Sequence, residues 1–145
     1  MADDRTTDVG LYHFALSYRH AADELARRPA KGTHPHAPIR SLYHHSIELF
    51  LKAYLRLYGA EVAELEKIGH RFGPLLARCR SAGLTPDDED VEVINMLGCS
   101  DAWTRARYIE TGKFHWPTVE ALARTAKSLA GLSRAAFKAA GKPVR

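Results

Sequence analysis

The chain has 145 residues, of which 46% are hydrophobic and 26% charged, a composition typical of one soluble globular domain. This balance excludes disordered, collagen-like and disulfide-scaffold proteins. The formal net charge of +4 is unevenly distributed, because residues 101–145 carry nine cationic and three acidic side chains. That excess indicates an anionic partner, such as RNA, a nucleotide or an acidic protein, with an ordinary solvated helix face as the alternative.

No targeting or membrane segment is predicted. The longest stretch without Asp, Glu, Lys or Arg is ten residues, 9–18, whereas a membrane-spanning helix needs about 20. The N-terminus is acidic where a secretory signal is basic, and the two cysteines, Cys79 and Cys99, form no CxxC pair. We therefore expect a cytoplasmic protein with reduced thiols and a single domain over residues 1–145, its core spanning about 8–140.

Helical periodicity dominates the first half of the chain. A first helix is predicted from Asp8, as its N-cap, to the cations just before Pro29. Its apolar positions recur at three- and four-residue spacing: Leu11, Phe14, Ala15, Tyr18, Ala22, Leu25 and Ala26. A second helix is predicted from Pro38 to Tyr58, with Gly59 as its stop. Its broad apolar stripe is typical of the central helix of a bundle: Tyr43, Ile47, Phe50, Leu51, Tyr54, Leu55 and Tyr58.

Three more helices are predicted in the second half. One covers residues 69–81, and the next starts at the acidic run 87–90, is weakened or kinked at Gly98, and ends at Gly112. The last opens at residues 116–118 and runs towards Ala140. Its predicted inner face consists of Val119, Leu122, Ala126, Leu129, Ser133 and Phe137. Because no two-residue alternation is sustained anywhere, the fold class is predicted to be all-α, with about five helices.

Three segments in a fixed order resemble the HEPN superfamily of bacteria. They are residues 43–55 (YHHSIELFLKAYL), residues 68–76 (IGHRFGPLL), and residues 107–112 (RYIETG) followed by Pro117. The likeness covers roughly residues 8–135. It implies an up-and-down bundle of four to five helices, commonly a homodimer. Many members are ribonucleases of toxin–antitoxin, abortive-infection or CRISPR systems, often encoded beside a minimal nucleotidyltransferase. Others lack the catalytic motif and bind RNA or nucleotides, or mediate assembly.

The ribonuclease members carry an Arg followed four to six residues later by a His. There the imidazole moves protons while the guanidinium stabilises charge on the phosphate, and no metal is needed. At the late position this chain has Arg107 and His115, which are separated by seven residues, with Gly112 between them. A literal match exists at Arg40 and His45, but it lies at the start of the second predicted helix, where the family does not place the motif. These four residues are the catalytic candidates of a metal-independent ribonuclease.

The other histidines of this half of the chain also bear on the site. His34, His36, His44 and His45 lie within twelve residues, a grouping that imidazole-binding metals favour. Two of them occupy a proline-rich loop and the adjacent pair diverges by about 100° on a helix, so we predict neither a metal nor a cofactor. The simpler interpretation of His45 is that it supports Glu48 or a backbone carbonyl. His70 is interpreted as a helix-start residue that is hydrogen-bonded locally.

The leading hypothesis is therefore a HEPN-like binding module without catalytic activity. Its predicted ligand is RNA, a nucleotide or a partner protein, with Arg105, Arg107, Tyr108 and Lys113 as the expected contacts around the late Arg-Tyr pair. The alternatives are the metal-independent ribonuclease and an assembly partner of a nucleotidyltransferase. A homodimer is expected from the resemblance, and the aromatic residues of the second helix suit either a partner or a core.

Overall fold

The computed structural model describes residues 5–99 and 116–145, and this part of the chain is helical without a strand. The all-α class predicted from the sequence is therefore confirmed for these residues. Six helices are present: α1 (Asp8–Arg27), α2 (His36–Leu57), α3 (Val62–Ile68), α4 (Phe72–Ser81), α5 (Asp88–Leu97) and α7 (Val119–Ala139).

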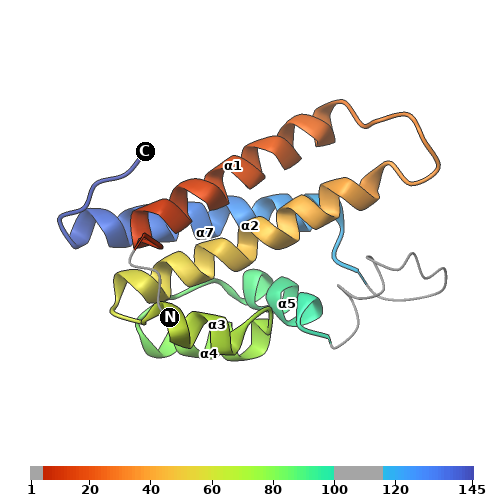
Figure 1. Ribbon diagram of the computed structural model, residues 1–145. Coiled ribbons are helices and arrows are strands. Elements are labelled where there is room, and N and C mark those ends of the chain that lie inside the picture. The colour runs from red at the N-terminus through yellow and green to blue at the C-terminus, as the bar shows by residue number, and fades with distance from the viewer. Residues whose placement is uncertain (1–4, 100–115) are drawn as a thin grey trace.

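Helix α2 is the centre of the molecule. It packs against α1 along much of its length and also contacts α7 and α4, while α5 contacts both α4 and α7. Figure 1 shows the three long helices α1, α2 and α7 side by side, with α3, α4 and α5 on the other side of α2. The core accordingly draws most of its large side chains from α2, including Tyr43, Phe50 and Leu51, all fully buried. The broad apolar stripe of this helix predicted a central position in the bundle, and α2 occupies that position.

Helix starts follow local capping chemistry. The Thr118 hydroxyl accepts a hydrogen bond from the Ala121 amide, and Asp87 accepts one from the Asp90 amide, so α7 and α5 begin where the sequence predicts. For α1 the predicted cap is wrong by one residue. Thr7 Oγ1 accepts from the Gly10 amide at 2.9 Å, which makes Thr7 the N-cap and places Asp8 inside the first turn.

Several predicted boundaries also differ from the structure. Helix α3 was not predicted, and α4 begins at Phe72 instead of Gly69, whose φ of 62° is a left-handed conformation that suits glycine. Helix α2 begins two residues before Pro38, a proline that its first turn tolerates. Helix α5 ends at Leu97 with Gly98 as its C-cap, so the chain stops being helical there instead of merely kinking. The predicted end at Gly112 lies outside the described residues.

The buried face of α1 differs from the predicted one. Phe14 is 63% exposed, while Tyr12, which the periodic set omitted, is 1% exposed and packs its ring on Phe50 and Phe137. Tyr58 at the end of α2 is exposed as well. The remaining aromatic residues of α2 are buried within the chain, so they offer no surface to a second copy. Among the described helices none is long and apolar enough to cross a membrane.

Candidate functional site

The structure places Arg40 and His45 on α2, five residues apart along the helix. A five-residue separation directs the two side chains about 140° apart around the helix axis. His45 lies edge-on to the ring of Tyr18, with ring centroids 4.3 Å apart. Burial lowers the pKa of His45, an effect that the Glu48 carboxylate opposes. Within the described part of the chain, no hydrogen bond or ion pair joins Arg40 to His45.

Glu48 receives its support from His70 and not from His45, which corrects the interpretation of both histidines. The Glu48 carboxylate is 3% exposed, and its Oε1 lies 2.7 Å from Nδ1 of His70. Its Oε2 accepts a hydrogen bond from Nζ of Lys52 at 3.2 Å, the ion pair that the i,i+4 spacing predicts. His70 therefore bonds across to α2, 22 residues away in sequence, instead of within its own turn.

The predicted ligand contacts and the late catalytic candidates Arg107 and His115 belong to one segment of the chain. Arg105, Arg107, Tyr108, Lys113 and His115 all lie outside the described residues. In the described ranges, 5–99 and 116–145, no group of three or more His, Cys, Asp and Glu side chains is arranged to hold a metal ion. The loop histidine His34 instead shares a hydrogen bond with the neighbouring Thr33 hydroxyl.

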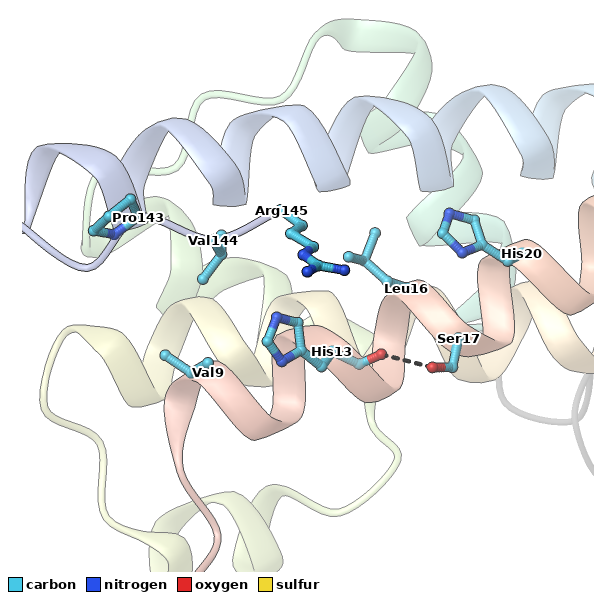
Figure 2. Close-up of a pocket in the computed structure, with 8 residues that line it drawn as sticks. All are labelled: Val9, His13, Leu16, Ser17, His20, Pro143, Val144 and Arg145. Carbon is cyan, nitrogen blue, oxygen red and sulfur yellow. Dashed lines mark hydrogen bonds between the residues drawn. The ribbon is translucent and has the colours of Figure 1, made fainter.

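A groove lies between α1 and α7 in the described structure. One hollow of about 590 Å³ lies between α1 and the chain segment that follows α7, and a second of about 390 Å³ lies between α1 and α7 themselves. Leu16, His20 and Arg145 line both hollows, and the two adjoining hollows together are here called the α1–α7 groove. Figure 2 shows Arg145 beside Leu16, between the imidazoles of His13 and His20.

The polar lining of the groove is basic. Its ionisable side chains, apart from the Tyr12 phenol, are His13, Arg19, His20, Lys127, Arg134 and Arg145, and no lining side chain is acidic. Small and aliphatic residues such as Leu16, Ala130 and Gly131 complete the surface. The positive charges and the apolar part of the lining together suit an anionic ligand that also carries apolar groups.

Three of the groove cations are not neutralised by the described part of the protein. In the part of the chain that the structure describes, no ion pair engages Lys127, Arg134 or Arg145. Arg19 pairs with Asp23, whose Oδ2 lies 3.7 Å from Nε, although Nε forms no hydrogen bond. Asp23 also accepts a hydrogen bond from the Tyr43 hydroxyl. The groove therefore presents positive charge to a ligand.

Tyr12 links the groove to the core. Its ring is buried, and burial raises the pKa of its phenol, an effect that the cations of Arg134 and Arg19 partly offset. Those two guanidiniums, one from each helix, thus act on the same hydroxyl. The phenol stays protonated and donates a hydrogen bond to the backbone carbonyl of Arg145 at 2.7 Å.

Only the α7 side of this groove could be anticipated from the sequence. Lys127, Arg134 and Arg145 belong to the basic C-terminal third from which an anionic partner was predicted. The α1 residues are spread among apolar positions, and nothing in their spacing distinguishes them from an ordinary solvated helix face. Comparison of the chain with protein-family models, with curated proteins and with solved structures finds no significant match.

Proposed function

We propose that this protein is a HEPN-like helical module that binds RNA in the α1–α7 groove without cleaving it. The observation that carries the proposal is the basic lining of the groove, in which Lys127, Arg134 and Arg145 form no ion pair among the described residues. Phosphate groups supply the complementary charge, and contacts between Lys or Arg and phosphates provide most sequence-independent affinity for nucleic acids. The resemblance to HEPN domains and the departure of Arg107 and His115 from the catalytic spacing support a binding role.

The distribution of the cations favours RNA over a single phosphate group. On α1, His13 and His20 are seven residues apart, and on α7, Lys127 and Arg134 have the same separation. Seven residues of helix span about 10 Å, so the basic side chains of each helix extend over a length that exceeds one phosphate. A chain of phosphates can extend along these side chains, and the imidazoles and aliphatic residues of the groove offer surfaces for bases.

Binding is tested with a fluorescently labelled oligouridine, titrated in EDTA at several salt concentrations. Affinity is expected to fall steeply as salt rises, because each phosphate contact releases a counterion. The variants Lys127→Ala and Arg134→Ala are each expected to weaken binding and to reduce the slope of log affinity against log salt by about one. Arg80→Ala is the matched control, since it removes an exposed cation from the last turn of α4, outside the groove.

Two results contradict the proposal. One is the absence of binding at low salt by folded protein. The other is an equal loss in Arg80→Ala and Arg134→Ala, which indicates attraction to overall charge instead of the groove. The same mixtures, run on a denaturing gel, test the ribonuclease alternative: the RNA is expected to stay intact, whereas metal-independent cleavage that His45→Ala or His115→Ala abolishes establishes an enzyme.

A further inference from the structure

The segment that follows α7 turns back over the groove. Gly141 has a φ of 75°, and the amide of Lys142 donates a hydrogen bond to the carbonyl of Phe137 at 2.8 Å. This left-handed glycine ends the helix and reverses the chain. Residues 143–145 then run along α1, where they form one wall of the larger hollow (Figure 2). Residues 142–145 are called the tail below.

The tail is attached to the start of α1 at two points. Nζ of Lys142 lies 2.8 Å from Oδ2 of Asp8, whose side chain is only 12% exposed, and the carbonyl of Arg145 accepts the hydrogen bond of Tyr12. The other oxygen of Asp8, Oδ1, accepts a hydrogen bond from the Val9 amide at 2.7 Å, which fixes the carboxylate. An ion pair with a largely buried partner holds its geometry better than an exposed one.

These attachments determine where one of the groove cations lies. Arg145 lines both hollows, but it belongs to the tail and not to either helix, so its position depends on how the tail is held. Asp8 does not line the groove. We infer that Asp8 is a positioning residue of the RNA site: by holding Lys142 it keeps the tail on α1 and the guanidinium of Arg145 in the groove. This inference rests on the proposed function.

The sign of one substitution separates this role from general electrostatics. Asp8→Asn removes a negative charge from a cationic protein, and charge alone then predicts tighter binding of a polyanion. A positioning role predicts the opposite, because release of the tail withdraws Arg145 from the phosphates. The inference therefore predicts that Asp8→Asn lowers the affinity for RNA, whereas the change in net charge alone predicts that it raises this affinity.

The experiment measures the affinity of labelled oligouridine for full-length variants over a salt series. Asp8→Asn is expected to weaken binding several-fold and to reduce the salt slope by about one, as Arg145→Ala does directly. In an Arg145→Ala background, Asp8→Asn is expected to cause no further loss, because the same contact is already absent. Glu24→Gln is the matched control, since it removes an exposed carboxylate from α1 that pairs with Arg27, and it is expected to bind no more weakly than wild type.

Tail attachment is measured separately by NMR relaxation of the Val144 and Arg145 amides in the absence of RNA. Asp8→Asn is expected to increase their motion, and Tyr12→Phe, which keeps the buried ring, provides a second way to loosen the tail should Asp8→Asn fail to fold. The inference is overturned if folded Asp8→Asn binds RNA as tightly as wild type or more tightly, or if these amides are already unrestrained in wild type. Failure of wild type itself to bind RNA overturns the proposed function and the inference with it.

Discussion

His70 Nδ1 lies 2.7 Å from Glu48 Oε1, and this hydrogen bond attaches the turn between α3 and α4 to the middle of α2. The donor is largely solvent-exposed, at 69%, whereas the acceptor is buried. Lys52, one turn further along α2, supplies the second partner of this carboxylate, with its Nζ 3.2 Å from Oε2. Glu48 and His70 belong to the first two segments on which the HEPN resemblance rests, so these segments meet in space through a polar contact.

Replacement of Glu48 is expected to destabilise the protein substantially. Glu48→Ala leaves Lys52 partly buried without its partner and opens space beside the core, which costs about 3 kcal/mol of unfolding free energy. Urea denaturation followed by circular dichroism measures the change. Glu64→Ala is the control, because Glu64 forms an exposed pair with Arg78, and exposed pairs contribute little to stability. Equal effects of the two substitutions contradict the buried position of Glu48.

Local capping signals explain why several helix starts were predictable. Asp87 and Thr118 act within three residues of their partners, so the relevant chemistry is contained in the sequence itself. The sequence did not allow a choice between Thr7 and Asp8 as the N-cap of α1, because both residue types cap helices well. Asp8 instead forms an ion pair with Lys142, which is more than 130 residues away in sequence. A contact between residues so far apart in the chain cannot be recognised from local residue spacing.

Burial on α1 shows the limit of periodicity. Two stripes run along this helix, one through Leu11, Phe14 and Tyr18 and another through Tyr12, Ala15 and Ala22. Both have helical spacing, and only the packing against α2 and α7 determines that the second stripe is fully buried. The groove was hidden for a similar reason, since its lining comes from residues 9–20, 127–134 and 143–145.

Asp90 is expected to be essential for the packing of α5 on α7. Its carboxylate is fully buried and accepts hydrogen bonds from the hydroxyls of Thr125 and Ser128. Nη2 of Arg124 lies 3.3 Å from its Oδ1. Asp90→Ala leaves these α7 groups without their acceptor, so the unfolding free energy is expected to fall by about 3 kcal/mol. Thermal unfolding measures the loss. Asp88→Ala, in the exposed first turn of the same helix, is expected to change stability by less than about 1 kcal/mol.

The two thiols are expected to react at very different rates. Cys79 is buried, its Sγ donates to the carbonyl of Leu51 at 3.2 Å, and burial raises the pKa of its thiol to about 12. Cys99 is exposed. An aromatic disulfide reagent should therefore modify one thiol rapidly and the other at least about a thousandfold more slowly, because the second needs an opening of the core. Cys99→Ser should remove the fast phase, and its persistence in that variant contradicts the assignment.

His44 is expected to make the protein less stable in mild acid. Its imidazole is buried edge-on to Phe72, and burial lowers its pKa from 6.5 to about 4, although the Glu48 carboxylate opposes the shift. Between these two values the unfolded chain takes up a proton that the folded chain does not, so acidification favours unfolding. The loss from this residue between pH 7 and pH 5 is about 2 kcal/mol.

Urea denaturation at several pH values in this range tests the role of His44. His44→Gln is expected to be less stable at neutral pH, because it disturbs a buried site, yet to lose much less stability on acidification than wild type. The control is His36→Gln at the exposed start of α2, which should retain the full pH dependence. The pKa of His45 is also lowered by burial, so His45 contributes to the pH dependence with the same sign. His45 is present in both wild type and His44→Gln, so the difference between these two proteins reports on His44 alone. An unchanged pH dependence in His44→Gln contradicts the buried, neutral imidazole on α2.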